Sequence, residues 1–233
     1  MPKAKIFEMN DGSGQFAFCN QNPVEKTEEK VDTRMPFSVP KDGKLFADLP
    51  DKKYSIIYAD PPWAYQDKHC NGSAEDHYPT VDIEELKKLP VSDIAADDCV
   101  LFMWATYPKL DEALELIKAW GFTYKTIGFQ WIKQNKSGNG FFFGLGRWTR
   151  GNTEPCLIAV KGKPKRLHAD VGQLVFSPLR NHSQKPDCVR DKIVRLMGDL
   201  PRIELFARNA AKGWDCWGNQ APEQKTDDFV KTV

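Results

Sequence analysis

The sequence lacks several features that would place the protein in a specialised class. No apolar run approaches the roughly 20 residues that a helix needs to cross a bilayer, and residues 1–5 lack the apolar stretch of a signal peptide. The six cysteines form no C-x-x-C pair and have no histidine at zinc-finger spacing, so we expect reduced thiols and no metal site. We therefore expect a cytoplasmic protein, of a bacterial cell or of a phage-infected host.

The chain also lacks an excess of charge of either sign. Its 33 Lys and Arg residues are balanced by 32 Asp and Glu residues, which gives a formal net charge of +1. This balance excludes a polycation that holds nucleic acid by its overall field, so any such contact must come from local basic clusters. The 233 residues, 41% of them hydrophobic, suffice for one domain with a sizeable core.

The sequence pattern changes near residue 45. Residues 1–45 are polar and charged and keep neither helical nor strand periodicity, which predicts an N-terminal arm or edge segment. Residues 46–222 alternate short apolar runs with amphipathic segments, a pattern typical of an α/β catalytic domain with a mostly parallel sheet. The polar residues 223–233 predict a frayed C-terminal tail.

Six strands and two helices are expected in this domain. Apolar residues at spacings of three and four predict a helix over residues 110–117, ending at Gly121, and a helix over residues 186–197, opened by Pro186 and closed by Gly198. Short apolar or alternating runs predict strands at residues 54–59, 99–104, 127–131, 156–160, 174–176 and 202–206.

The first expected strand stops at an acid, two prolines and a tryptophan: Asp60, Pro61, Pro62 and Trp63. Ligands of open α/β sheets bind beyond the carboxyl ends of the strands, which makes Asp60 a candidate functional acid. The prolines remove two backbone donors, so nearby carbonyl oxygens are predicted to be rigid and free of competing donors. The Asp60 carboxylate and the Pro61 carbonyl would hold the two hydrogens of a planar amine, while Trp63 offers a stacking face for an extruded base. Taken alone, Asp-Pro-Pro is better explained as a strand-ending turn.

Residues 58–63, Y-A-D-P-P-W, resemble the signature of the adenine N6-methyltransferase family. That family includes the catalytic subunit of the eukaryotic messenger-RNA adenosine methyltransferase and bacterial and phage DNA adenine methyltransferases. The resemblance spans roughly residues 50–220 and implies a Rossmann-like S-adenosylmethionine-dependent methyltransferase fold with permuted motif order. Further matches are L-F-M-W at 101–104, S-Q-K-P at 183–186, E-L-F-A-R-N at 204–209 and G-W-D-C-W-G-N-Q at 213–220.

The resemblance implies S-adenosylmethionine as the cofactor and assigns residues to it. Lys185, just before a helix, would take the methionine carboxylate with help from the helix N-terminus. Taken singly, these residues have other interpretations: a surface position for Lys185, an ion pair with Glu204 for Arg208, and a turn for Asn219. Polar side chains of the C-terminal segment would hold the ribose and the adenine: Arg208, Asn209, Asn219 and Gln220.

Residues 134–153 form a glycine-rich loop that interleaves aromatic and basic residues. Its Arg147, Trp148 and Arg150 suit stacking on bases and neutralising phosphates, so the loop is a candidate nucleic-acid clamp. The alternative is a partly buried hydrophobic hairpin with two exposed arginines. A second basic cluster, residues 161–166, is interpreted as a solvated turn. The resemblance implies that Tyr78 packs near the target adenine and that Glu154 and Arg180 fall near active-site positions of the family.

These observations predict in-line transfer of a methyl group to the N6 amine of adenine in DNA, after extrusion of the base. Three alternatives stay open: adenine in RNA, the exocyclic amine of cytosine, and a noncatalytic nucleic-acid-binding partner subunit. Methylation of a cytosine carbon is disfavoured because no cysteine occupies the catalytic turn. The sequence leaves open whether the protein is a monomer or a dimer.

Overall fold

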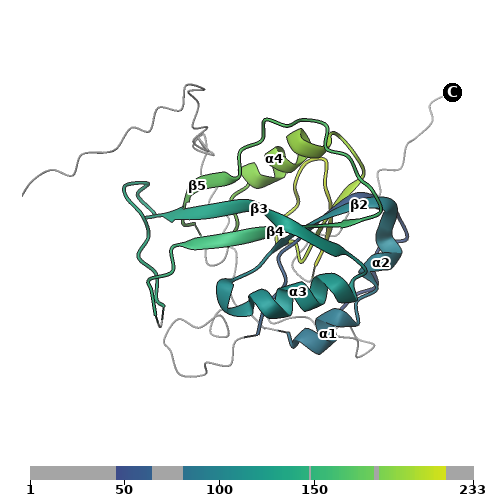
Figure 1. Ribbon diagram of the computed structural model, residues 1–233, viewed down its shortest axis with the longest axis horizontal. Helices are drawn as coiled ribbons and strands as arrows, with labels where there is room; N and C mark the ends of the chain where they lie inside the picture. Colours follow the sequence, from purple (N-terminus) through teal and green to yellow (C-terminus); the bar gives the residue numbers. More distant parts are fainter. Residues whose placement is uncertain (1–45, 65–80, 147, 181–183, 219–233) are drawn as a thin grey trace, which may run out of the picture.

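The computed structural model describes residues 46–64, 81–146, 148–180 and 184–218 (Figure 1). The arm predicted for residues 1–45 and the tail predicted for residues 223–233 lie outside these residues, so the predicted domain boundaries stay predictions. No helix within the described ranges has the length and apolar character needed to cross a bilayer.

The described residues form one seven-stranded sheet in the order β5-β3-β4-β2-β1-β6-β7. β1 pairs in parallel with both β2 and β6, and the pairs β3–β5 and β6–β7 are also parallel, whereas β4 runs antiparallel to both of its neighbours. The predicted α/β class with a mostly parallel sheet is therefore confirmed. The strands are β1 (Tyr54–Ala59), β2 (Ala95–Trp104), β3 (Thr123–Gln134), β4 (Thr153–Lys161), β5 (Leu174–Pro178), β6 (Arg202–Leu205) and β7 (Asp215–Trp217).

Helices cover both faces of this sheet (Figure 1). On one face lie α1, α2 and α3, and on the other lies α4. Because the central strand β1 is covered on both sides, it is apolar at successive positions rather than at alternate ones. Ile57 packs in the core beneath α1 to α3, and Ile56 packs in the core beneath α4. The helices are α1 (Ile83–Lys87), α2 (Val91–Ile94), α3 (Leu110–Ala119) and α4 (Cys188–Met197).

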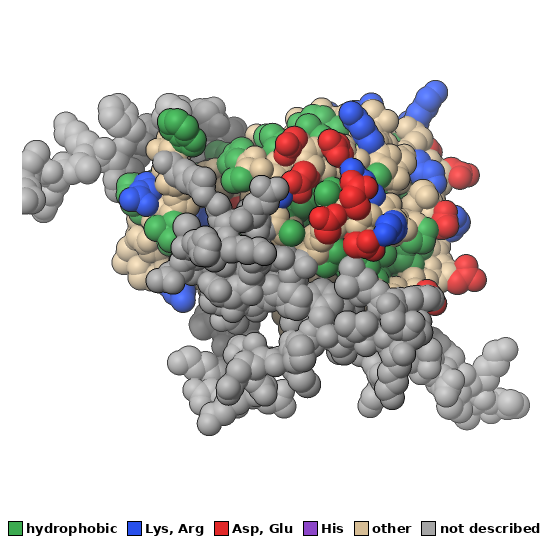
Figure 2. All heavy atoms as spheres, turned by 90° about the horizontal axis from the view of Figure 1, so that it is seen from below, with side chains coloured by type: hydrophobic (Ala, Val, Ile, Leu, Met, Phe, Trp, Pro, Cys, Tyr) green, Lys and Arg blue, Asp and Glu red, His purple; other side chains and the backbone are tan. Residues whose placement is uncertain are grey.

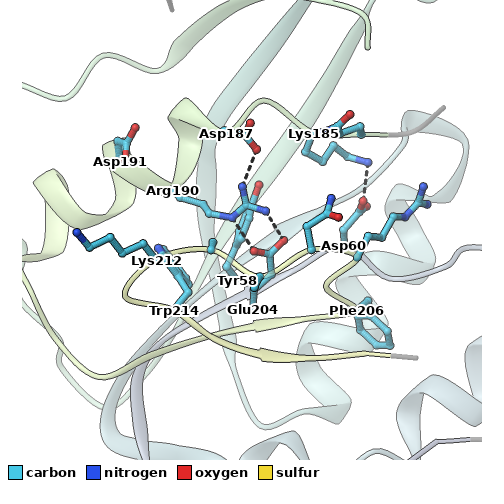
Figure 3. Close-up of a pocket in the computed structure, with 15 residues that line it drawn as sticks. Tyr58, Asp60, Lys185, Asp187, Arg190, Asp191, Glu204, Phe206, Lys212 and Trp214 are labelled. Atoms are coloured by element: carbon cyan, nitrogen blue, oxygen red, sulfur yellow. Dashed lines mark hydrogen bonds and ion pairs between the residues drawn. The ribbon is translucent and has the colours of Figure 1, made fainter. Parts of the chain in front are cut away.

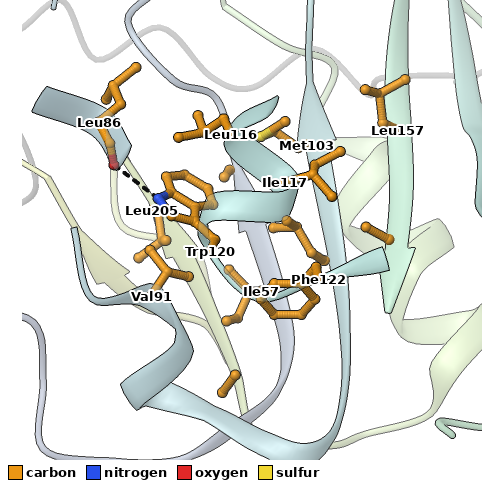
Figure 4. Packing of buried hydrophobic residues seen from close by; sticks show 14 of the residues in the cluster. Ile57, Leu86, Val91, Met103, Leu116, Ile117, Trp120, Phe122, Leu157 and Leu205 are labelled. Atoms are coloured by element: carbon orange, nitrogen blue, oxygen red, sulfur yellow. Dashed lines mark hydrogen bonds between the residues drawn. The ribbon is translucent and has the colours of Figure 1, made fainter. Parts of the chain in front are cut away.

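Trp120 closes the core beneath α1 to α3 (Figure 4). Its ring is 1% exposed, and its Nε1 donates a hydrogen bond to the Leu86 carbonyl at the end of α1, 2.9 Å away. Burying an indole of this size removes a large apolar area from water, and the hydrogen bond satisfies its single polar atom. This contact fixes α1 against the end of α3.

All six predicted strands and both predicted helices are present, but most of their ends differ from the prediction: β3, β4 and β5 are longer than predicted, and β2 and α4 begin elsewhere. β2 begins at Ala95 rather than Cys99, because the exposed Asp97 and Asp98 interrupt the apolar run that marks the strand in the sequence. α4 begins at Cys188 with Asp187 as its N-cap, so Pro186 precedes the helix and does not occupy its first turn. The elements α1, α2 and β7 were not predicted, because segments of five, four and three residues show no usable periodicity.

The winding of the sheet changes direction between β1 and β6. From β1 the chain crosses to β2 by way of α1 and α2 on one face, whereas it reaches β6 by way of α4 on the other face. When the connections of two adjacent strands run over opposite faces of a sheet, a crevice forms beyond the carboxyl ends of these strands. Ligands of α/β proteins bind in such crevices. Asp60 directly follows β1 at this crevice.

Candidate active site

A cavity of about 410 Å³ opens beyond the carboxyl ends of β1 and β6 (Figure 3). This volume lies within the range of small-molecule sites. Charged side chains of both signs line it, together with aromatic rings. Its wall includes Tyr58 and Asp60 from the end of β1, Lys185 and Asp187 ahead of α4, Arg190 of α4, and Glu204, Phe206, Arg208, Asn209, Lys212 and Trp214 from β6 and the turn that follows it.

Asp60 is held by a lysine at the edge of this cavity. The Lys185 Nζ donates a hydrogen bond to Asp60 Oδ2 at 2.9 Å and lies 3.1 Å from Glu154 Oε1. Glu154, on β4, also forms an ion pair with Lys133 on β3, with 2.8 Å between Oε2 and Nζ. The Lys185 side chain is only 8% exposed. The surface position that the sequence left open for Lys185 is therefore wrong.

Burial and these neighbours shift the pKa of each carboxyl differently. Burial raises the pKa of Asp60 above its usual range, and Lys185 offsets this only in part. Burial would also raise the pKa of Glu154, but Lys185 and Lys133 more than compensate and lower it. The same two carboxylates outweigh the burial of Lys185 and raise its pKa. Glu154 is thus the more firmly ionised carboxylate, and Asp60 is the one whose charge is less favoured.

The two prolines of the tetrapeptide do not leave their carbonyls free of competing donors, and that prediction is wrong. The Pro61 carbonyl accepts a hydrogen bond from the Trp63 N–H at 2.9 Å, and the Pro62 carbonyl accepts one from the Val81 N–H at 2.9 Å. The donors come from residues downstream, which proline substitution does not remove. A carbonyl oxygen has two lone pairs, so the Pro61 oxygen retains capacity for one further donor.

Trp63 does not present the stacking face predicted for it. Its side chain is 5% exposed and packs in the core beneath α1 to α3, where its Nε1 donates to the Trp104 carbonyl at 3.3 Å. The physical reason is that β1 ends between two buried layers, so the first large apolar side chain after the prolines completes the core. Trp63 anchors the tetrapeptide, and a stacking partner for a base must come from elsewhere. Tyr78, the other aromatic residue predicted beside the target adenine, lies outside the described residues.

Arg190 and Glu204 form a second charged pair at the floor of the cavity (Figure 3). Arg190 donates two hydrogen bonds to the Glu204 carboxylate, at 2.6 and 2.9 Å, and a third to Asp187 at 2.7 Å. The ion pair considered from sequence for Glu204 was with Arg208, and the structure shows one with Arg190. Arg208 and Asn209 both line the cavity, as expected of cofactor-binding residues. Asn219 and Gln220 lie outside the described residues.

Arg180 supports the segment that carries Lys185. Its Nη2 donates to the Lys185 carbonyl oxygen at 2.9 Å, and its Nη1 lies 2.7 Å from Asp187 Oδ2. Asp187 therefore connects Arg180 to Arg190. Arg180 thus supports two residues of the cavity wall, Lys185 through its main chain and Asp187 through its carboxylate.

The loop between β3 and β4 lies at the same edge of the sheet as the cavity, because Trp104, at the end of β2, pairs with Cys156 near the start of β4. The strands form an antiparallel hairpin, as in the alternative interpretation. In its loop Phe142 is half-buried and Gly144 is buried, whereas Phe143 is 75% exposed and Trp148 is 99% exposed. The Arg150 guanidinium lies 5.6 Å from the centre of the Phe143 ring. Arg147 lies outside the described residues.

The second basic cluster lies at the opposite edge of the sheet, where Lys161 pairs with Cys99. The Lys161 Nζ donates to the Ser92 carbonyl at 3.1 Å, and the Lys163 N–H donates to Asp98 at 2.6 Å. The cluster is thus tied into a turn remote from the cavity, which agrees with its interpretation as a solvated turn. In the described part of the chain, no group of three or more His, Cys, Asp or Glu side chains is arranged to hold a metal ion.

The comparison with known proteins agrees with this geometry. The MT-A70 family matches residues 54–220, from the start of β1 to the segment after β7. The chain belongs to the MT-A70 family. The predicted resemblance to adenine N6-methyltransferases is thereby confirmed, and with it the Rossmann-like methyltransferase fold.

Individual relatives of this MT-A70 protein fall into two size classes. It is 39% identical over 204 residues to the type II methyltransferase M.MunI of Mycoplasma sp, an alignment that covers 79% of this chain and 84% of the other. It is 32% identical over 172 residues to the N(6)-adenosine-methyltransferase subunit METTL3 of Danio rerio, and 31% identical to the catalytic subunit METTL3 of Homo sapiens. Each of these two alignments covers 72% of this chain but only 28% of the relative.

The sequence alone did not identify several of the residues that line the cavity as site residues. Glu204 carries a signal that could have found it, since a charged residue inside the otherwise buried strand β6 requires a partner. Arg190 is spaced three residues from Asp187, which is also visible in the sequence. Tyr58 and Trp214 carry no such signal, because buried aromatic residues are common in any core.

Proposed function

We propose that this chain transfers a methyl group from S-adenosylmethionine to the N6 amine of adenine in DNA. The observation that carries the proposal is the position of Asp60 beyond the end of β1, at the edge of a cavity of cofactor size, in a chain that matches the MT-A70 family from residue 54 to residue 220.

The cavity suits S-adenosylmethionine in its size and in its donor set. Lys185, Arg208 and Lys212 offer cations for a carboxylate, and Asp187 and Glu204 offer acceptors for hydroxyl and amino groups. Phe206 and Trp214 supply apolar surface, while Asn219 and Gln220 remain the proposed contacts to the ribose and the adenine. The cofactor supplies an electrophilic methyl group on a sulfonium.

Asp60 and Pro61 are proposed to orient the amine that attacks this methyl group. A carboxylate has about four acceptor sites, so Asp60 accepts a hydrogen bond from the amine while Oδ2 keeps its bond to Lys185. The remaining lone pair of the Pro61 oxygen takes the second amine hydrogen. Holding both hydrogens draws the nitrogen lone pair out of conjugation and aims it at the methyl carbon. Asp60 need not act as a strong base, because the proton leaves after the nitrogen has become positively charged.

Glu154 is proposed to act on the substrate side through the Lys185 ammonium that it shares with Asp60. The exposed Trp148 and Phe143, with Arg147 and Arg150, are proposed to contact the nucleic acid. This loop contains no acidic residue between positions 134 and 153, so it attracts phosphates along its whole length. By contrast, acidic side chains gather with basic ones among them on the described part of the face that α1 and α3 form, where Lys87 pairs with Glu84 and Glu115 (Figure 2).

DNA is proposed as the polymer on the basis of sequence similarity. The chain is 39% identical to the type II methyltransferase, against 32% and 31% for the two METTL3 proteins. The presence of both Asp60 and a charged cavity supports an active enzyme over a noncatalytic partner subunit.

Incubation with radiolabelled S-adenosylmethionine and separate pools of DNA and RNA tests the proposal. We expect label in DNA, recovered as N6-methyladenine after digestion to nucleosides. Label confined to RNA would reject DNA, and label in a cytosine nucleoside would reject adenine. Cofactor binding without transfer to either pool would favour the partner-subunit alternative.

A further inference from the structure

Four side chains of alternating charge form a continuous chain that ends at Asp60. It runs from Lys133 on β3 to Glu154 on β4, then to Lys185 ahead of α4, then to Asp60 after β1. The successive nitrogen-to-oxygen distances are 2.8, 3.1 and 2.9 Å. The two ends, Lys133 and Asp60, are 21% and 23% exposed, whereas Glu154 and Lys185 between them are 8% exposed.

Two buried tryptophans support the two lysines of this chain. The Lys133 Nζ lies 5.0 Å from the centre of the Trp131 ring, and the Lys185 Nζ lies 5.7 Å from that of Trp104. Both rings are fixed by hydrogen bonds, Trp131 Nε1 to the Ser177 carbonyl at 3.0 Å and Trp104 Nε1 to the Tyr58 hydroxyl at 2.5 Å. Aromatic faces attract ammonium groups, so the rings help to fix both nitrogens.

The charges of the four groups cancel only when Lys133 is included. Without its ammonium, two carboxylates would share the single ammonium of Lys185 in a largely buried place, where an uncompensated charge is costly. Lys185 and Lys133 are the cations that lower the pKa of Glu154. Of the other groups near these carboxylates, Arg208 and Glu204 interact with Asp60. The Cys156 thiol is neutral, because burial raises its pKa well above the usual range.

We propose that Lys133 is a positioning residue, which acts through Glu154 to hold the Lys185 ammonium on Asp60 without itself touching substrate or cofactor. Lys133 keeps Glu154 ionised and oriented. Ionised Glu154 holds one side of the Lys185 ammonium, which fixes the direction from which the ammonium meets Asp60 Oδ2. The acceptor geometry at Asp60 thus depends on a residue of β3, which is separated from β1 by the two strands β4 and β2. The inference rests on the proposed function in one respect: its effect on activity can be measured only if the chain transfers methyl groups.

The test compares Lys133→Met with Lys133→Arg and Lys125→Met in the full chain. Methionine keeps an unbranched side chain over Trp131 but removes the charge, and arginine restores the charge. Lys125 is exposed near the start of the same strand, so K125M controls for loss of one positive charge on β3. The first measurement is the titration of the Glu154 carboxyl by carbon-13 NMR of labelled glutamate, with the resonance assigned by Glu154→Gln. The second is the dependence of kcat and KM on pH with DNA as substrate.

In K133M we expect the pKa of Glu154 to rise by about one unit or more, as loss of an adjacent opposite charge predicts. We expect kcat at neutral pH to fall about tenfold, with KM for DNA changed less than about twofold, because a displaced catalytic group slows the chemical step. K133R should recover most of both values, and K125M should match the unaltered chain. A Glu154 pKa that is the same in K133M and the unaltered chain overturns the inference.

The two readouts separate the inference from the proposed function. If the unaltered chain methylates no nucleic acid, the proposed function fails, but the NMR titration still decides whether Lys133 governs Glu154. If the Glu154 pKa rises in K133M while kcat does not change, the electrostatic link exists but does not reach Asp60, and the positioning role is rejected.

Discussion

The Lys185 ammonium lies 2.9 Å from Asp60 Oδ2, so the residue expected to hold the carboxylate of the cofactor is the direct partner of the proposed amine acceptor. One ion pair thus joins the two halves of the site, which are the tetrapeptide after β1 and the segment before α4. Its two residues lie 125 positions apart in the sequence. Any change at Lys185 should affect both halves at once. A variant at Asp60 is therefore the cleaner probe of the transfer step.

Replacing Asp60 with asparagine should abolish methyl transfer without unfolding the protein. Asparagine keeps the shape of the side chain, but its nitrogen cannot accept, so we expect a loss of at least about 100-fold in kcat, comparable to removal of other preorganised polar groups. Because the folded-state pKa of Asp60 is raised, the ionised form is disfavoured in the fold, and removing the charge should leave the thermal midpoint at neutral pH unchanged or higher. Transfer assays and thermal denaturation measure the two effects. Full activity of D60N would reject the proposed role of Asp60.

Acid should inactivate the enzyme before it unfolds the ion-pair network. The raised pKa of Asp60 means that it becomes protonated above the ordinary value of about 4, and protonated Asp60 no longer presents a carboxylate to the amine. Glu154 has a lowered pKa, so its stabilisation is present above the unfolded value of about 4.3 and is lost only as the pH falls through the lower folded value. The transfer rate should therefore fall, reversibly, at a pH where circular dichroism still reports the native fold. Coincident loss of rate and fold would contradict this order.

Two arginines on α4 should differ sharply in their importance for stability. Arg190→Met leaves the buried Glu204 carboxylate without its two hydrogen bonds, which should lower the free energy of unfolding by about 3 kcal/mol. Adding Glu204→Gln to that variant should recover part of the loss. Arg195 pairs with Asp170 at the surface, where both side chains are 58% exposed, so Arg195→Met should change stability little. Urea denaturation of the three variants compares these effects, and equal losses for R190M and R195M would be inconsistent with the buried pair.

Gly218 should not tolerate a side chain. A Cβ at this position would lie 2.7 Å from the Ala207 carbonyl oxygen and 2.8 Å from the Ala207 nitrogen, both backbone atoms that cannot move aside cheaply. We expect Gly218→Ala to cost about 1–3 kcal/mol of stability, as overpacking does elsewhere, and to weaken cofactor binding through the adjacent Asn219 and Gln220. At Gly172 an added Cβ meets nothing within 4 Å, so Gly172→Ala is the matched control. Calorimetry measures binding, and denaturation measures stability.

Two cysteines should resist alkylation in the folded protein. Burial raises the pKa of the Cys99 thiol to about 12, and it raises that of Cys156 well above the usual range. Because the thiolate is the reactive form, iodoacetamide at pH 8 should leave both unmodified until denaturant is added. Mass spectrometry of peptides from native and denatured samples reads this directly. Rapid modification of Cys156 in the native sample would instead indicate a nucleophilic cysteine and would support methylation of a cytosine carbon.

Much of the architecture could be predicted from the sequence, because the main strands and helices depend on patterns of neighbouring residues. The buried strand ending at Asp60, the helix before Gly121 and the helix before Gly198 all follow from hydrophobic periodicity and stop signals over neighbouring residues. The family was readable for a similar reason, since the DPPW corner and the segments around Lys185 and Arg208 are short contiguous motifs. Their position beyond strand ends also follows from the sequence.

What each side chain contacts was decided only in three dimensions. Trp63 looks like a stacking platform in the sequence, but the layers around β1 bury it. The sequence motif also gives no sign that the Lys185 ammonium pairs with both Asp60 and Glu154, because that contact depends on the position of β4. Such pairings join residues far apart in the chain and depend on sheet order and burial, and burial in turn sets which carboxylate keeps its charge. The sequence by itself identified Asp60 as the candidate functional acid after β1. The tertiary structure determined its charged neighbours, and these neighbours together with burial set its pKa.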